Sequence, residues 1–135
     1  PVTNWIATNA HLYLWVTNQF MVEGHHLALA WGFKVKTILT WVKPGLRMGF
    51  YYRNNTEHVL FGVHGSLKTL RRDVPTAFSG RSPRRHSEKP DAFYDMVESM
   101  SPGPYLDVFA RKQRFNWDTY GFEAFDFQTD GIWHK

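Results

Sequence analysis

The 135-residue sequence contains no cysteine, which excludes disulfide bonds, thiolate metal sites and cysteine nucleophiles. It contains no P-loop and no Gly-X-Gly-X-X-Gly motif. No apolar run is long enough to cross a membrane, and no signal-peptide pattern opens the chain. We therefore expect no membrane partner and a protein that is not secreted: cytoplasmic, or nuclear in a eukaryote.

What remains is the composition of a basic globular domain that is rich in aromatic residues. Hydrophobic residues make up 43% of the chain and aromatic residues 17%, which is enough for a packed core. The net charge of +4 permits an anionic partner without identifying one. The length predicts a single domain over residues 1–135, with no second domain.

The hydrophobic pattern predicts strands alternating with helices. Residues 11–17 (HLYLWVT) form a continuous apolar run, which predicts a strand covered on both faces, as in a parallel sheet. Further strands are predicted over residues 35–42, 57–63 and 105–110, with a short edge strand within 73–78. One helix over residues 20–31 is closed by Gly32, and another begins at Pro90 and ends before residues 101–104 (SPGP). The order β-α-β-β-α-β predicts an α/β three-layer sandwich.

Two loops are candidates for nucleic-acid contact. Residues 43–56 combine the cations Lys43, Arg47 and Arg53 with the rings of Tyr51 and Tyr52. Cations can contact phosphates and rings can stack on an unpaired base, although rings packed on the sheet beside solvated charges remain an alternative. The long loop at residues 64–88 is a second candidate for backbone contacts, through Arg71, Arg72, Arg84 and Arg85.

The polar residues around the last predicted strand indicate a ligand crevice. Open α/β sheets bind ligands outside the carboxyl ends of their strands, where a carboxylate can accept hydrogen bonds from ribose hydroxyls. Arg111 and Glu123 follow the strand predicted over residues 105–110, and Lys89 lies beside a helix N-terminus, where anions are favoured. The alternatives are a solvated lysine and a surface ion pair. No metal site is expected, because the adjacent His25 and His26 point to different helical faces.

In series, six segments resemble the MT-A seventy family of S-adenosylmethionine-dependent N-6 adenine methyltransferases, a circularly permuted Rossmann-like class. They are residues 12–18 (LYLWVTN), 31–43 (WGF to WVK), 57–65 (EHVLFGVHG), 86–91 (HSEKPD), 101–104 (SPGP) and 109–123 (FAR to NWDTYGFE). The resemblance implies a Rossmann-like methyltransferase three-layer sandwich of that permuted class.

The sequence departs from the family pattern at two places. The catalytic tetrapeptide Asp-Pro-Pro-Trp, which in the family lies upstream of the segment at residues 12–18, is absent. We therefore expect a domain truncated at its N-terminus, with no catalytic residue in this chain. The family's cofactor motif usually ends in Gly-Asn-Glu or Gly-Asn-Gln, whereas this chain has Gly121-Phe122-Glu123.

The resemblance implies S-adenosylmethionine as cofactor. Lys89 would pair with the carboxylate of its methionine part, Glu123 would bind the ribose, Arg111 would shape that pocket, and Asn116 would also reach the cofactor. The intact protein would methylate the N-6 amine of adenine in DNA or RNA, on a single-stranded or flipped base, while the chain alone would be inactive. A second methyltransferase-like subunit or a homodimer is the expected protein partner. The alternative is a non-catalytic nucleic-acid-binding partner subunit.

Overall fold

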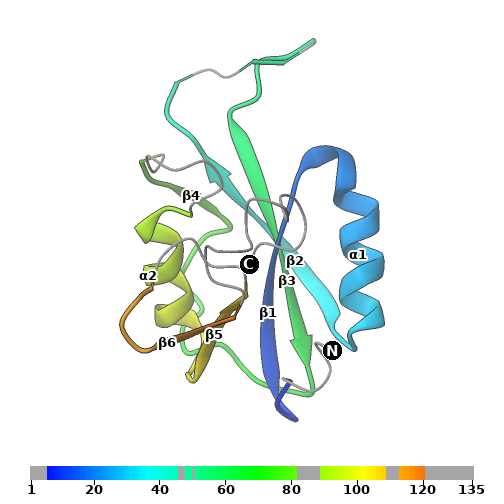
Figure 1. Cartoon of the computed structure of the whole chain (residues 1–135), viewed down its shortest axis with the longest axis vertical. Coiled ribbons are helices and arrows are strands. Elements are labelled where there is room, and N and C mark those ends of the chain that lie inside the picture. The colour runs from blue at the N-terminus through cyan, green and yellow to red at the C-terminus, as the bar shows by residue number, and fades with distance from the viewer. Residues whose placement is uncertain (1–5, 46–47, 50, 82–88, 109–112, 121–135) are drawn as a thin grey trace.

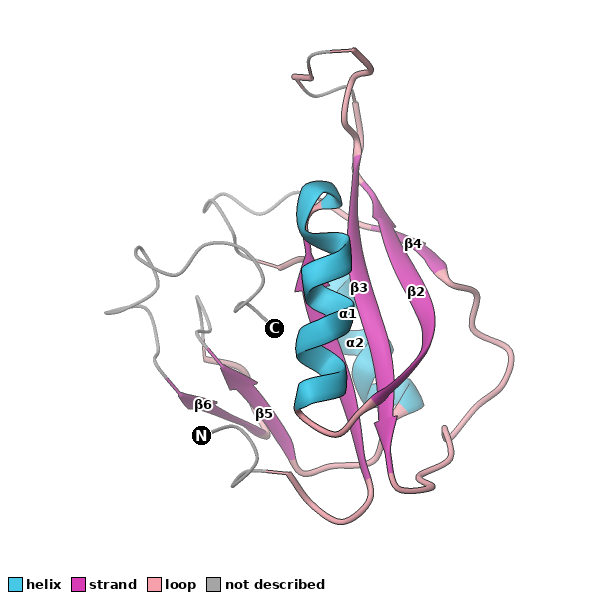
Figure 2. Cartoon of the chain, turned by 90° about the vertical axis from the view of Figure 1, so that its right-hand side faces the viewer, coloured by secondary structure: helices cyan, strands magenta, loops and turns pink. Residues whose placement is uncertain are grey.

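The computed structural model describes residues 6–45, 48–49, 51–81, 89–108 and 113–120. Four strands form the main sheet in the order β1-β3-β2-β4 (Figure 1). They are β1 (Ala10–Val16), β2 (Lys34–Val42), β3 (Thr56–His64) and β4 (Ala77–Ser79). Helix α1 (Met21–Ala30), preceded by the short turn η2 (Asn18–Phe20), covers one face and helix α2 (Asp91–Met100) covers the other (Figure 2). The described residues therefore form the predicted three layers.

The neighbours of β1 differ from the prediction. Strand β3 runs antiparallel to both β1 and β2, and its register with β1 runs from Ala10↔His64 to Val16↔His58. Within the main sheet only β2 and β4 pair in parallel. The continuous apolar run predicted cover on both faces, and that part is confirmed. The parallel pairing inferred from it is wrong for β1, because cover by two helices produces the same run whatever the direction of the neighbouring strand.

The α1 face of the sheet is a purely apolar cluster. It contains Leu14 and Val16 from β1, Leu60 from β3, and Ala28 and Phe33. Small residues let the helix approach closely: a Cβ built at Gly24 of α1 would lie 2.5 Å from Val16 Cγ1. Gly32, with φ of 90°, ends the helix as predicted, since this left-handed backbone favours glycine.

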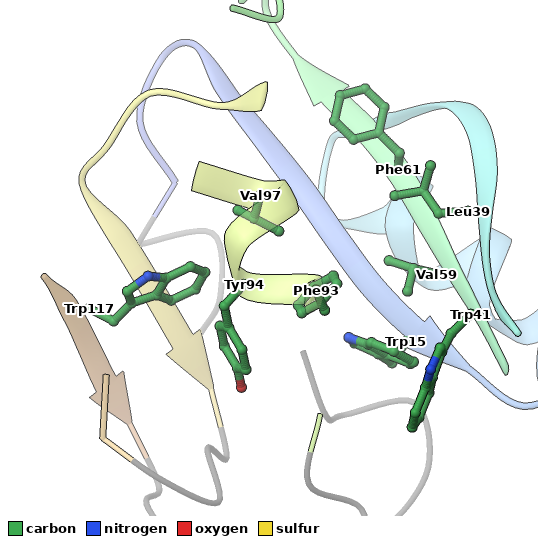
Figure 3. Close-up of a cluster of buried hydrophobic side chains, with 9 residues drawn as sticks. All are labelled: Trp15, Leu39, Trp41, Val59, Phe61, Phe93, Tyr94, Val97 and Trp117. Carbon is green, nitrogen blue, oxygen red and sulfur yellow. The ribbon is translucent and has the colours of Figure 1, made fainter. Parts of the chain in front are cut away.

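The α2 face is an aromatic cluster (Figure 3). Phe93, 1% exposed, lies at its centre with its ring centroid 5.0 Å from Trp15 and 5.4 Å from Tyr94. The other buried members are Leu39, Trp41, Val59, Phe61, Val97 and Trp117. Aromatic pairs with edge-to-face geometry are worth about 0.5–1.5 kcal/mol each beyond the area they bury. This cluster holds α2 on the sheet.

The C-terminal end of α2 is joined to β1 by polar contacts. The Ser101 hydroxyl, 4% exposed as a residue, is hydrogen bonded to His11 Nδ1 at 2.6 Å and to the Tyr13 hydroxyl at 2.7 Å. Burial raises the pKa of Tyr13 to about 12, so its hydroxyl stays protonated near neutral pH. These contacts fix the end of the helix that lies opposite its Lys89 end.

A second sheet pairs β5 (Tyr105–Val108) in parallel with β6 (Trp117–Tyr120). Strand β5 was predicted, although residues 109–110 of the prediction lie outside the described residues. Strand β6 was not predicted, because its four residues, WDTY, contain no apolar run and were interpreted as part of a polar loop. No helix in the described part of the chain has the length and apolar character needed to span a membrane.

Candidate functional site

Lys89 is buried at the start of α2. It directly precedes Pro90, which caps the helix in extended backbone. Only 9% of Lys89 is exposed, and its Nζ lies 4.6 Å from the centroid of the Trp15 ring. Burying an ammonium group is costly unless the site supplies charge or hydrogen-bond acceptors. Lys89 is therefore not the solvated loop lysine that was the alternative.

Trp15 adds a second polar group at the same place. The residue is 2% exposed, and within the described residues its Nε1 has no hydrogen-bond acceptor. A buried indole N–H usually has a partner. A cation and a nearby N–H donor together suit a ligand that carries a carboxylate or another acceptor group.

This pair of side chains lies at the carboxyl ends of three strands. Trp15 is the penultimate residue of β1, and its ring lies 6.0 Å from that of Trp41, the penultimate residue of β2, and 6.4 Å from that of Phe78 in β4. Strands β1, β2 and β4 run in the same direction, because β1 and β2 are both antiparallel to β3. The location is the one where open α/β sheets bind ligands.

The connection between β2 and β3 extends beyond this same end of the sheet (Figure 2). Tyr51 is 97% exposed and Tyr52 88% exposed, so the alternative in which these rings pack on the sheet is wrong. Arg53 beside them is also exposed, whereas Arg47 lies outside the described residues. The exposed rings provide stacking surfaces and the arginine provides a cation.

Lys43 supports the base of this connection. Its Nζ forms an ion pair with Glu57 at the start of β3 and lies 5.3 Å from the centroid of the Trp41 ring. The Thr40 hydroxyl is hydrogen bonded to His58 Nδ1 at 3.0 Å, and burial lowers the pKa of His58. Lys43 is thus half-buried and paired, which leaves it less available to a phosphate than Arg53.

The arginines of the second basic loop lie elsewhere. Arg71 and Arg72 are exposed, and Leu70 N donates to Met100 O, at the C-terminal end of α2. Arg71 donates to both carboxylate oxygens of Asp73, at 2.9 and 2.8 Å, which raises the pKa of Arg71 and lowers that of Asp73. The structure therefore places Arg71 at the opposite end of α2 from Lys89. Arg84 and Arg85 lie outside the described residues.

The remaining predicted cofactor residues are only partly described. Arg111 and Glu123 lie outside the described residues. Asn116 is exposed in the turn before β6, with φ of 68°, and lines an open hollow with Glu98, Tyr105, Arg114 and Phe115. Glu98 follows Lys89 by nine residues, roughly 13 Å along a helix axis. Asn116 and Lys89 can therefore reach one ligand only if that ligand is extended.

Sequence reasoning missed three polar residues around α2. Asp107 of β5, 3% exposed, accepts a hydrogen bond of 2.7 Å from the Tyr94 hydroxyl. Arg114 donates to Glu98, which lowers the pKa of Glu98 and raises that of Arg114. The available signal was the acidic spacing of the helix, which puts Asp91, Asp95 and Glu98 on one face. No group of three or more potential metal ligands was found among the described residues.

Comparisons with known proteins agree with the resemblance. The MT-A70 family model, which describes the family named above, matches residues 1–123. The chain is 32% identical over 115 residues to a putative N(6)-adenosine-methyltransferase MT-A70-like protein of Medicago truncatula, covering 78% of this chain and 19% of the relative. It is 32% identical over 132 residues to the N(6)-adenosine-methyltransferase subunit METTL3 of Danio rerio, covering 90% of this chain and 22% of the relative. It is 31% identical over 132 residues to the N(6)-adenosine-methyltransferase catalytic subunit METTL3 of Homo sapiens, again covering 90% of this chain and 22% of the relative. The chain thus spans about a fifth of the length of these relatives. On this evidence the chain belongs to the MT-A70 family.

Proposed function

We propose that the protein containing this chain transfers a methyl group from S-adenosylmethionine to the N-6 amine of adenine in a nucleic acid. The chain supplies the cofactor-binding and sheet-core part of this enzyme. Family membership supports the proposal, as do the names of the relatives, which are N(6)-adenosine methyltransferases. Because those names specify adenosine, RNA is the first substrate to test and DNA the second.

The observation that carries the proposal is the buried Lys89 on the Trp15 ring. Lys89 directly precedes the N-cap of α2, and its ammonium lies on the ring of Trp15, at the carboxyl ends of three strands. A helix N-terminus favours an anion, and the carboxyl ends of strands are where open α/β sheets bind ligands. The carboxylate of the cofactor's methionine part fits this position, and Trp15 Nε1 is a further donor close by. The residues present therefore suit this cofactor.

Three other residues complete the proposed cofactor contacts. Glu123 accepts hydrogen bonds from the ribose hydroxyls, Arg111 shapes that pocket, and Asn116 offers an amide from the turn before β6. The bound cofactor supplies an electrophilic methyl group on its sulfonium sulfur. The work of the protein is alignment, since holding two reactants in line is worth several kcal/mol of the barrier.

The exposed rings of the β2–β3 connection are the proposed nucleic-acid contact. Tyr51 and Tyr52 are exposed residues of this connection, which follows the carboxyl end of β2, and Arg53 comes next in the sequence. Stacking on these rings suits an unpaired adenine or its neighbour, and stacking is worth about 1–3 kcal/mol per base. Arg47 contributes positive charge near the phosphates, and Lys43, which is paired with Glu57, contributes less than Arg53. Arg71 and Arg72 lie at the far end of α2, so they would contact the phosphate backbone only of a longer oligonucleotide.

The enzyme also needs residues that hold the amine, and the sequence has no Asp-Pro-Pro-Trp. Among the described strands, β1 pairs only with β3 and β5 only with β6, so each has an unpaired edge. We infer that a further strand, from the same protein or from a second methyltransferase-like subunit or copy, pairs with one of these edges and supplies the tetrapeptide. An unpaired edge in the isolated chain favours such pairing.

A non-catalytic nucleic-acid-binding subunit is the second candidate. The absent tetrapeptide and Phe122, which cannot make the polar contact of the family's Asn, favour this alternative. Such a protein would bind the oligonucleotide through Tyr51 and Tyr52 without binding the cofactor. Cofactor affinity therefore distinguishes the two functions.

A calorimetric titration with S-adenosylhomocysteine tests the proposal. We expect the unaltered chain to bind, and Lys89→Ala to weaken binding about tenfold or more, because a hydrogen bond to a charged group is worth about 1.5–3 kcal/mol. Glu123→Ala should weaken it as well. Lys36→Ala, which removes an exposed lysine of β2, is the matched control and should leave affinity unchanged. A folded chain that binds an adenine-containing oligonucleotide but no S-adenosylhomocysteine would favour the non-catalytic function.

A further inference from the structure

Arg114 forms the densest ion-pair contact among the described residues. Its Nε donates to Glu98 Oε2 at 2.9 Å and its Nη2 donates to Glu98 Oε1 at 3.2 Å, a two-pronged contact. Nη2 also donates to Asp95 Oδ1 at 2.6 Å, and Nη1 lies 3.9 Å from Asp91 Oδ1. The guanidinium lies 5.4 Å from the centroid of the Tyr94 ring. One arginine thus contacts the whole acidic face of α2.

The ion pairs of Arg114 differ in strength because the side chains that form them differ in exposure to water. The side chains of Asp91 and Asp95 are 70% and 69% exposed, so water screens their attraction to Arg114. Glu98 is 32% exposed and Arg114 is 22% exposed, and their paired geometry is the one in which arginine binds carboxylate best. Glu98 is therefore the main partner of Arg114.

Glu98 also receives a hydrogen bond from β6. Trp117 Nε1 donates to Glu98 Oε2 at 2.6 Å, and the Trp117 ring stacks on Tyr105 of β5 at 4.9 Å and 18°. The turn between Arg114 and Trp117 is closed by Trp117 N donating to Arg114 O at 3.0 Å. The turn before β6 is therefore attached to α2 from both of its ends.

This attachment joins two segments that the proposed function assigns to one cofactor. Helix α2 begins immediately after Lys89. The turn from Arg114 to Trp117 contains Asn116, which the proposed function also assigns to the cofactor. Lys89 and Asn116, the two described residues among the proposed cofactor contacts, are therefore carried by two segments that Arg114 joins.

We propose that Arg114 is a positioning residue for the cofactor: by binding the acidic face of α2 it holds the turn before β6 at a fixed place relative to Lys89. The proposal rests on the proposed function, because it takes S-adenosylmethionine as the shared ligand. The role proposed for Arg114 is to position the turn, and not to contact the cofactor. The positioning depends more on the two hydrogen bonds from Arg114 to Glu98 than on the positive charge. A lysine at this position would keep the charge but has a single ammonium group in place of the planar guanidinium.

The test compares Arg114→Lys and Arg114→Gln in the full chain. S-adenosylhomocysteine affinity is measured by calorimetry at a temperature well below the unfolding transition of every variant. Hydrogen exchange is followed in parallel by mass spectrometry over residues 113–120 and 91–100. Leu14→Ala, in the cluster beneath α1, is the control for lost stability, and Lys36→Ala is the control for a lost charge.

We expect both Arg114 variants to bind S-adenosylhomocysteine about tenfold more weakly or worse, in line with the cost of misplacing supporting groups. Exchange over residues 113–120 should be faster in both variants, and both controls should bind like the unaltered chain. Arg114 variants that bind normally overturn the proposal, as does an equal loss of affinity in Leu14→Ala.

The two readouts also separate this proposal from the proposed function. If the unaltered folded chain does not bind S-adenosylhomocysteine, the proposed function fails and the cofactor role of Arg114 fails with it. Hydrogen exchange then still decides whether Arg114 holds the turn on α2. If the unaltered chain binds and only the Arg114 effect is missing, the positioning role alone is refuted.

Discussion

Replacing Phe93 is the most direct test of whether the aromatic cluster under α2 supports the proposed cofactor site. The residue is 1% exposed, and its ring contacts those of Trp15, Tyr94 and Tyr13 at centroid distances of 5.0, 5.4 and 5.9 Å. Truncating a buried Phe to Ala costs about 3–5 kcal/mol. Domains of this size have total stabilities of about 5–15 kcal/mol, so Phe93→Ala removes a large share. Phe93→Leu keeps a large apolar side chain at the site and is the milder change, so it is the variant expected to remain folded.

The function should change with the stability, because α2 carries Lys89 at its start. A helix that tilts or shifts on the sheet moves the ammonium away from the Trp15 ring, where its Nζ now lies at 4.6 Å. We therefore expect Phe93→Leu to weaken S-adenosylhomocysteine binding severalfold under conditions in which the protein remains folded. Urea unfolding followed by circular dichroism gives the stability, and calorimetry gives the affinity.

Leu14→Ala is the matched control on the same strand. Leu14 is 0% exposed and lies one residue before Trp15, but it belongs to the cluster beneath α1. Its truncation should cost about 2–5 kcal/mol of stability while leaving the affinity unchanged. An affinity that falls as much in Leu14→Ala as in Phe93→Leu would refute the reasoning, since the two faces would then not be separable.

Three other predictions concern pH, the nucleic acid and the reaction. Because the hydrogen bond from Arg114 lowers the pKa of Glu98 below its ordinary value of 4.5, the contribution of Glu98 to stability is complete above that pH and is lost as the pH falls through the lowered value. Glu98→Gln should therefore lower the melting temperature at neutral pH and flatten its fall in acid; equal acid limbs in thermal melts would contradict this. Replacing Tyr51 and Tyr52 by Ala together should weaken binding of a single-stranded adenine-containing oligonucleotide about tenfold or more in fluorescence anisotropy, with an unchanged melting temperature, because stacking is worth about 1–3 kcal/mol per base and both rings are exposed; unchanged affinity would exclude them as contacts. The chain alone should transfer no tritiated methyl group from S-adenosylmethionine to RNA or DNA, because the amine-holding tetrapeptide is absent, and robust transfer by the purified chain would show that other residues hold the amine.

The parts of the fold that could be predicted from sequence are those fixed by local signals. Gly32 ends α1 with a positive φ of 90°, and Pro90 caps α2, as the sequence predicts. The apolar run of residues 11–17 corresponds to β1, which is covered on both faces. Each of these features depends on the conformational preference of one residue or on the spacing of apolar residues within one element.

The parts that could not be predicted depend on contacts between distant segments. Strand β6 forms because Trp117 stacks on Tyr105 and donates to Glu98, not because its four residues favour a strand. Arg114 was not singled out from the sequence, since nothing local relates it to a helix that ended fourteen residues earlier. The antiparallel direction of β3 relative to β1 could not be predicted either, because a run of apolar residues indicates that helices cover both faces of a strand but does not indicate the direction of its neighbour.

Buried polar groups lie on only one of the two faces of the main sheet in the described part of the chain, the face covered by α2. All three buried polar residues in the described part of the chain lie on or beside α2: Lys89 before its first residue, Ser101 after its last, and Asp107 bonded to Tyr94. The unpaired Nε1 of Trp15 lies on the same face, whereas the cluster beneath α1 is apolar throughout. Polar groups in a core cost stability, and chains retain such departures from apolar packing chiefly where a site requires them. The α1 face is therefore purely structural, and the Lys89 end of α2, where a buried cation and the Trp15 indole N–H lie together, is the part of the sheet to test for ligand binding.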